Sequence, residues 1–326
     1  MDEEEKGSWR KCLGEVHQLI STYGAAEAKK MADSKLERQC FEAAEAVMGD
    51  DRFDLNVLHS GFAMTGLPHK SIKDLVWERA GGQDNEVTLL IESGHWQDKR
   101  PVGIPYGSIA RLILIYLSSE AIANNSQVVE LGTNMKSFLG RMGISPGGKS
   151  RQIVKDQSQR LSMCNLTFFT KRNRGTLVNK GQFVKNAFIP DAETDNQPSF
   201  WQPTVELDDA FFQSLKDHPL PLREAAIRQL SGRSMALDLY VFLSYRLHVL
   251  TKPTPVSWAA LYQQFGAGFA KQWVFVQGIK APLNLALAAY PEANVDITEK
   301  GLILHPSESP VPKVHPRAGR LKLTSL

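Results

Sequence analysis

The segment GISPGGKS, residues 143–150, has the spacing G-x-x-x-x-G-K-[ST] of a phosphate-binding loop. In such a loop, glycine amides and the lysine hold the phosphates of a nucleotide, and a buried strand ends just before it. Here the preceding residues, KSFLGRM, have apolar side chains at helical spacing. Pro146 removes one amide donor, and no run of four apolar residues ending in Asp follows to hold magnesium. We therefore interpret the segment as the turn between two helices, and we expect no enzyme activity and no cofactor.

The helix expected after this turn, residues 151–163, has an apolar side and a side suited to reading DNA. The residues on the apolar side are Ile153, Val154, Gln157 and Leu161. The opposite side carries Arg, Lys and Gln, whose donors suit the acceptors on base edges in the major groove. We therefore predict a recognition helix that binds double-stranded DNA. The residues expected at this part of the interface are Lys149, Ser150, Arg151, Gln152, Lys155 and Gln159.

Basic residues are concentrated in this part of the chain. Residues 133–185 contain eleven Lys and Arg and a single acid, Asp156. This window carries a net charge of +10 in a chain whose total is +3, so the remainder carries −7. An ordinary solvated surface would mix both signs, whereas a binding site for a polyanion gathers positive charge. The asymmetry predicts a nucleic-acid interface.

The elements around the turn follow the order of a winged helix-turn-helix domain. A buried helix over 108–124 precedes a short extended stretch at 128–132. Thr133 is expected to cap the helix that leads into the turn, and Ser150 the helix that follows it. The order helix, strand, helix, turn and helix is then completed by a hairpin.

The predicted hairpin consists of a strand over 165–172, a polar basic loop over 173–181 and a returning strand over 182–190. It would form the wing, whose basic side chains contact the DNA backbone and fix the register. The wing residues expected to do so are Lys171, Arg172, Arg174 and Lys180. Arg160, on the preceding helix, would either span to a phosphate or pair with Asp156.

The second half of the chain repeats this order in outline. Its expected pieces are a buried helix over 235–250, a rigid linker over 251–255, a helix over 258–265 capped by Ser257, a helical stretch over 271–289 and a tight hairpin over 294–307. Ala110 and Thr133 are 23 residues apart, and the matching Ala236 and Ser257 are 21 apart. These similar spacings favour an internal duplication of one unit.

The second unit gives a weaker indication of DNA contact, because Gly278 and Pro282 are expected to interrupt its last helix. Its exposed polar residues fit either packing or DNA contact, and they are Lys271, Gln272, Gln277 and Lys280. We include Lys271 and Lys280 among the DNA-binding candidates. Three arginines on the preceding helical segment would either reach phosphate or face solvent, and they are Arg223, Arg228 and Arg233.

Composition excludes several classes of protein. Hydrophobic residues at 42% and charged residues at 22% are globular values. The acidic start, MDEEEKGSWRK, is no secretory signal, and the apolar run 112–117 is far shorter than the ~20 residues of a membrane span. Three cysteines and eight histidines show no ligand spacing. We expect reduced thiols, no metal site, no membrane contact and a cytoplasmic location.

These patterns together predict an α+β fold of tandem winged helix-turn-helix domains with an N-terminal helical segment. The expected boundaries are 1–50 for the helical segment, 51–205 for the first winged-helix domain, 206–306 for the second, and 307–326 for a disordered basic tail.

Several stretches, in order, resemble the plasmid-encoded RepA family of replication initiators. In the first half they are HSGFAMTGLPHKS (59–71), GIPYGSIARLILIYLSSEA (103–121), the ELG and FLGRMGISPGG segments, and RLSMC (160–164). In the second half they are PLPLREAAIRQL, ALDLYVFLSYRLH, VSWAALYQQFG, AYPEA and GLILHPS. The resemblance covers roughly residues 58–307 and leaves out the first 50 residues and the tail.

The resemblance implies a cytoplasmic bacterial protein that binds direct repeats, or iterons, at a plasmid origin, opens the duplex and recruits host replication proteins such as the replicative helicase. It also implies that a homodimer represses the protein's own gene. An alternative hypothesis is a winged-helix transcriptional repressor without initiator activity. A simple repressor needs only one such unit per subunit, and the second unit argues against it.

Overall fold

The computed structural model describes residues 15–51, 54–81, 86–186 and 204–311. The chain divides into two compact units. We call residues 56–220 the central unit, and residues 15–55 together with 221–311 the terminal unit. The chain crosses between them within β1 (Leu55–His59) and β9 (Pro219–Arg223). Both units combine helices with antiparallel sheets, so the predicted α+β class is confirmed.

Among the described residues, two sheets and five helices lie wholly within the central unit. Its helices are α5 (Gly61–Met64), α6 (Gly107–Asn124), α7 (Met135–Arg141), α8 (Gly148–Met163) and α9 (Asp209–Asp217). One sheet has the strand order β2-β3-β5-β6, with β2 (Val76–Gly81), β3 (Val87–Glu92), β5 (Asn165–Arg172) and β6 (Gly175–Gln182). The other has the order β4-β8-β7, with β4 (Val128–Glu130), β7 (Val184–Asn186) and β8 (Thr204–Leu207).

Helix α6 forms the core of the central unit. The apolar run 112–117 is buried on every side, as the sequence predicts for a core helix. In the four-stranded sheet, Phe168 of β5 lies opposite Leu89 of β3 and Asn179 of β6. Phe168 and Leu89 are buried. One face of this sheet is therefore buried, and β6 lies at the edge of the sheet.

The structure corrects several local expectations. The segment 173–181, expected to be a loop, is mostly strand β6, which pairs with β5 along its whole length. Its residues 175–178 are exposed on both faces of an edge strand, so the sequence there shows no alternation of apolar and polar residues. The expected returning strand is shorter, because only Val184–Asn186 is strand, and 187–190 lie outside the described residues.

Two predicted helix caps are wrong. Asn134, not Thr133, caps α7, since its side chain accepts a hydrogen bond from the Ser137 amide. Helix α8 begins at Gly148, with Gly147 at its N-cap, so Ser150 lies inside the first turn. In contrast, Ser257 caps its helix as predicted, because its hydroxyl accepts from the Ala260 amide at 3.2 Å.

The terminal unit joins the N-terminal helices to the second half of the chain. Its helices are α2 (Glu15–Tyr23), α3 (Ala25–Lys30), α4 (Lys35–Met48), α10 (Glu224–Leu230), α11 (Ser234–Arg246), the short 3-10 helix η2 (Leu247–Val249), α12 (Trp258–Phe265) and α13 (Gln272–Ala288). Its sheet has the order β10-β12-β11, with β10 (Thr254–Ser257), β11 (Val295–Thr298) and β12 (Gly301–Leu304). The end of the expected linker 251–255 is therefore part of β10.

Helix α4 begins with a capping box formed by Ser34 and Glu37. Its buried face includes Cys40, Ala44 and Val47, and it packs against α10 and α13. The N-terminal helices thus contribute to the core of the terminal unit.

Helix α13 runs through Gly278 and Pro282 without a break, so the expected interruption is wrong. Pro282 has no amide to donate to the carbonyl four residues earlier, which is that of Gly278. Phe269 occupies the space where a side chain at position 278 would lie. Burial of Phe275, Ile279 and other residues on the same face holds the helix together across this point.

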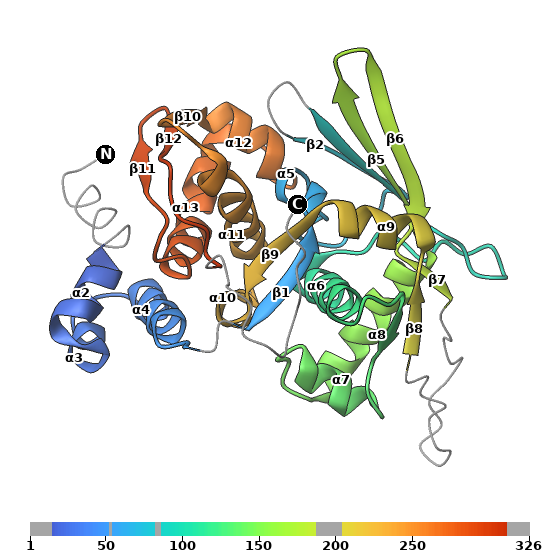
Figure 1. The fold of residues 1–326 in the computed structure, drawn as a ribbon, viewed down its shortest axis with the longest axis horizontal. Coiled ribbons are helices and arrows are strands. Elements are labelled where there is room, and N and C mark those ends of the chain that lie inside the picture. Colours follow the sequence, from blue (N-terminus) through green and yellow to red (C-terminus); the bar gives the residue numbers. More distant parts are fainter. Residues whose placement is uncertain (1–14, 52–53, 82–85, 187–203, 312–326) are drawn as a thin grey trace. The chain divides into compact units, whose positions relative to one another are not determined.

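The two units share one topology (Figure 1). In the central unit α6, β4, α7 and α8 precede β7 and β8, and in the terminal unit α11, β10, α12 and α13 precede β11 and β12. In both sheets the first strand pairs with the last, which pairs in turn with the last but one. The β5–β6 hairpin is an insertion between α8 and β7. It belongs to the sheet of β2 and β3, not to the sheet of β4.

Candidate nucleic-acid interface

The turn between α7 and α8 is built from glycine and proline. Helix α7 ends at Arg141, and Gly143 adopts a left-handed conformation with φ of 68°. The turn ends at Gly147, and α8 begins with Gly148. Because a helix and not a strand precedes this turn, GISPGGKS lacks the strand–loop–helix context of a phosphate-binding loop.

The inner face of α8 is apolar apart from one glutamine. Val154, Gln157 and Leu161 are buried, as predicted. The Gln157 side chain accepts a hydrogen bond from the Tyr106 amide at 2.8 Å and donates to the Asp156 carboxylate at 2.7 Å. Ile153, expected on this face, is 38% exposed, which corrects the prediction. A buried glutamine whose amide oxygen and nitrogen are both hydrogen-bonded fixes α8 to the segment before α6.

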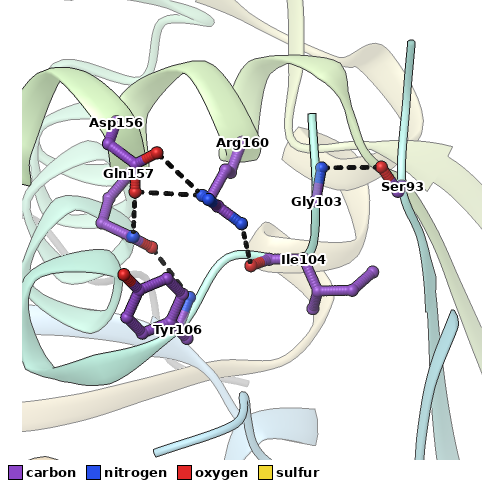
Figure 2. A network of polar contacts seen from close by, with 7 residues as sticks. All are labelled: Ser93, Gly103, Ile104, Tyr106, Asp156, Gln157 and Arg160. Carbon is purple, nitrogen blue, oxygen red and sulfur yellow. Dashed lines mark hydrogen bonds and ion pairs between the residues drawn. The ribbon is translucent and has the colours of Figure 1, made fainter. Parts of the chain in front are cut away.

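Arg160 holds α8 in place from the same side (Figure 2). Its Nε donates to the Asp156 carboxylate at 3.0 Å, and its Nη1 donates to the Ile104 carbonyl at 3.2 Å. Its guanidinium also lies over the Tyr106 ring, 5.3 Å from the centroid. Of the two roles that the sequence left open, the structure shows the pairing with Asp156.

The backbone under Arg160 is adapted to it. Gly103 has φ of 92°, and a Cβ at this position would clash with Nη1 of Arg160. The Gly103 amide donates to Ser93 Oγ at 2.8 Å, which ties the segment to the end of β3 (Figure 2).

Arg111 on α6 joins a further segment to this structure. It is buried, and it donates to the carbonyl of Leu67 at 2.6 Å, of Pro68 at 3.2 Å and of Gly107 at 2.8 Å. Three stretches that carry the resemblance, at 59–71, 103–121 and 160–164, therefore meet around the start of α6. These contacts give the three stretches a structural role, because they join the stretch that contains α6 to residues 67–68 and to α8.

The outer face of α8 presents most of the predicted DNA-binding side chains. Lys149, Arg151 and Gln152 are exposed, and Ser150, Lys155 and Gln159 are partly exposed. At about 100° per residue, Arg151, Gln152, Lys155 and Gln159 share one arc of the outer face, whereas Lys149 lies outside this arc and Ser150 lies on the buried side of the first turn. Asp156 is the single acid on α8, and Arg160 and Gln157 bind it, so the outer face keeps its positive charge.

The predicted wing residues lie elsewhere. Lys171 and Arg172 end β5, Arg174 lies in the turn, Lys180 lies on β6, and all four are exposed. Figure 1 shows the tip of this hairpin at the opposite end of the central unit from α7. The structure thus does not place these residues beside the start of α8. The sequence interpretation assigned the hairpin of β5 and β6 as the wing beside the α7–α8 turn, and this position is not the one observed.

In the terminal unit, α13 corresponds to α8 in the shared topology. Lys271 is exposed at its N-cap, and Lys280 is half-buried. Trp273, in the first turn, is 67% exposed. Sequence reasoning missed Trp273, although its place directly after Lys271 and Gln272 is a signal that could have found it. The Trp273 ring is therefore accessible at the start of α13.

The three arginines before α11 differ from one another. Arg223 is buried at the end of β9, donates to the Asp50 carbonyl at 3.3 Å and lies 3.7 Å from the Glu292 carboxylate. Arg228 is the one arginine on α10, where it pairs with Glu224. Arg233 directly precedes α11. The expectation that all three share a helical segment is wrong, and Arg223 has a structural role.

Other chemistry finds little support in the described residues. Burial raises the pKa of the Cys164 thiol to about 12, which removes it as a nucleophile. No group of three or more His, Cys, Asp or Glu side chains is placed to hold a metal ion in the described ranges. Within the same ranges, no helix has the length and apolar character to cross a membrane.

Residues 104–259 match the sequence profile of the plasmid-encoded RepA protein family. This confirms the resemblance for that part of the chain. The RepA match runs from just before α6 to the start of α12, so it includes α7, α8 and the β5–β6 hairpin. No curated protein matches the sequence.

Among solved structures, the chain is similar to domains 2 and 3 of RctB. A crystal structure of their selenomethionine derivative has 12% sequence identity and a TM-score of 0.47, over 76% of this chain and 99% of that one. A second crystal structure of RctB domains 2–3 has 11% identity and a TM-score of 0.44, over 67% of this chain and 79% of that one.

Proposed function

We propose that this chain is a plasmid replication initiator that binds double-stranded DNA through tandem winged-helix units. The observation that carries the proposal is the outer face of α8, where Arg151, Gln152, Lys155 and Gln159 gather and the one acid is bound by Arg160 and Gln157. The match of residues 104–259 to plasmid-encoded RepA proteins supports an initiator role. The repeated topology supports two units of the same kind.

In this proposal α8 lies in the major groove. Arg151, Gln152 and Lys155 read base edges, and Lys149 with the first turn of the helix contacts phosphate. Helix α13 makes a second contact, with Lys271 at its start and Lys280 further along. Two such contacts on adjacent grooves would select a long DNA site.

The protein acts by binding and not by catalysis, and it needs no cofactor of its own. It binds direct repeats at the origin, opens the duplex and recruits host replication proteins such as the replicative helicase in the cytoplasm. As a homodimer it represses its own gene. A repressor without initiator activity is the second candidate, and the repeated unit favours the initiator.

The first test is selection of full-length protein from a random duplex library at near-physiological salt. One long motif, read in two adjacent grooves, is expected, and it should recur in the plasmid origin. Enrichment of a short motif only would favour the repressor. Binding without enrichment that disappears as salt rises would overturn sequence-specific recognition. Loss of plasmid replication when the gene is removed separates the initiator from the repressor.

A further inference from the structure

The far part of the β5–β6 hairpin, residues 171–178, is exposed on both faces. Pairing between the strands continues to Arg172 opposite Gly175, and we call residues 171–178 the ribbon. Strand β3 pairs with β5 as far as Thr170, and the Lys171 amide donates to the Glu86 carbonyl just before β3. The tip of the ribbon, residues 172–175, therefore extends beyond the rest of its sheet, whereas Leu177 and Val178 lie level with β3 (Figure 1).

Two aliphatic side chains stand on this ribbon in solvent. Leu177 is 44% exposed and Val178 is 51% exposed. Neighbouring residues of a strand point to opposite faces, so the ribbon has an apolar side chain on each face. Leu177 lies opposite Thr170, and Val178 lies opposite Phe169. Aliphatic side chains in such a position add little to the core and are accessible to a partner.

The charge of the same segment indicates the partner. From Gln157 to Pro190 the sequence has six basic residues and no acid. Arg160 pairs with Asp156, and Lys185 pairs with Glu206 and Asp209. The four other basic residues are on the hairpin, and they are Lys171, Arg172, Arg174 and Lys180. Clustered cations beside aliphatic side chains, in a stretch of sequence that contains no acid, suit the phosphates and bases of nucleic acid.

We propose that this ribbon is a second DNA-contacting element of the central unit, separate from α8, which unstacks a base step. Its cations hold the phosphate backbone, and Leu177 and Val178 contact the bases. A two-stranded ribbon fits a DNA groove, and proteins that kink DNA insert leucine and similar side chains between base steps. The proposal rests on the proposed function, because it gives a structural basis to the opening of the duplex.

The ribbon would meet the DNA away from the base pairs that α8 reads. The reading residues lie in the first turns of α8, whose 16 residues span ~24 Å. Strand β5 follows α8 directly, is ~26 Å long at full extension, and leads to a tip that Figure 1 shows at the opposite end of the central unit from α7. The unstacked step is therefore expected outside the motif that α8 recognises.

The test compares full-length wild type with the double variant Leu177→Thr/Val178→Thr, which keeps strand-forming residues. Val76→Thr is the matched control, because Val76 is also 51% exposed and lies on β2, at the other edge of the same sheet. The readouts are affinity for a duplex with the selected motif, and permanganate oxidation of thymines flanking it. Circular dichroism verifies that each variant is folded.

We expect the double variant to lower thymine reactivity ~10-fold while its affinity falls less than ~3-fold, and the control to match wild type. Equal reactivity in the double variant and wild type would overturn the inference, as would wild type that binds the motif without any reactive thymine. A wild type that selects no motif would overturn the proposed function itself. A further outcome is that wild type and the control bind phosphatidylglycerol vesicles while the double variant does not. If the double variant then keeps the thymine reactivity of wild type, the ribbon is a membrane contact and the inference is overturned.

Discussion

The Arg160 guanidinium lies 3.0 Å from the Asp156 carboxylate, one turn earlier on α8, and it also donates to the Ile104 carbonyl. This pair divides the basic residues of α8 into two groups. Arg160 fixes the helix to the body of the central unit, whereas Arg151 and its neighbours remain on the outer face. Variants at Arg160 and Arg151 should therefore have different effects on stability and on DNA binding.

Arg160→Ala should destabilise the packing of α8 by about 2 kcal/mol, since it removes a part-buried ion pair and a charged hydrogen bond. Hydrogen exchange of the α8 amides measures this directly. The dependence of DNA affinity on salt should keep its slope, because Arg160 contacts no phosphate. A reduced slope with normal amide protection would instead place Arg160 in the DNA interface.

Arg151→Ala should show the opposite pattern. Amide protection in α8 should stay within about 0.5 kcal/mol of wild type, because the side chain is exposed. Discrimination at one base pair of the selected motif should fall by ~1–3 kcal/mol. Lys73→Ala, an exposed cation outside α8 and the hairpin, is the control and should leave discrimination intact. Equal weakening on cognate and scrambled duplexes would argue against base reading by Arg151.

Arg172→Ala should weaken binding to all duplexes alike. A lost phosphate contact lowers the slope of log K against log salt by about one. Titrations at several salt concentrations, again with Lys73→Ala beside it, measure the slope. A slope equal to that of wild type would remove Arg172 from the interface.

The sequence predicted α8 well because its buried residues recur at helical spacing, and Val154, Gln157 and Leu161 face inward as expected. It did not predict β6, because an edge strand exposed on both faces carries no period of two. The role of Arg160 stayed open because one of its partners, Ile104, lies 56 residues earlier in the chain. Burial of Arg223 depends on Asp50 and Glu292, which are similarly distant. Local sequence patterns do not predict contacts between remote segments of the chain.

The stability of the central unit should depend on pH through His59. Burial, followed by the nearby His218, lowers the pKa of His59 to about 4 from 6.5. Its Nδ1 accepts from the Gly61 amide at 3.0 Å, and its Nε2 bonds to Ser214 Oγ at 2.9 Å, so the neutral ring is the form that fits. The unfolded chain takes up the proton first. The contribution is therefore complete above about pH 6.5 and is lost as the pH falls to about 4.

This loss should reach about 3 kcal/mol, and hydrogen exchange of the β5 amides across that range measures it. Phe168 of β5 stacks on His59, with ring centroids 4.8 Å apart, so these amides report on the site. His59→Gln cannot take up the proton and should flatten the profile, even if it lowers stability at neutral pH. Parallel profiles for the variant and wild type would assign the pH dependence to another group.

Two glycines near α8 should respond oppositely to alanine. Gly103→Ala should destabilise the central unit by at least ~2 kcal/mol, because its φ of 92° disfavours a side chain and a Cβ would clash with Arg160. Gly148→Ala should be neutral or stabilising by up to about 1 kcal/mol, since nothing lies within 4 Å of a Cβ there and alanine favours the helix.

Gly148 is also a required glycine of the phosphate-loop pattern. If wild type has no affinity for ATP, and Gly148→Ala keeps the stability and the DNA affinity of wild type, the segment acts as the turn of a helix-turn-helix. ATP binding by wild type that this variant abolishes would restore the nucleotide site.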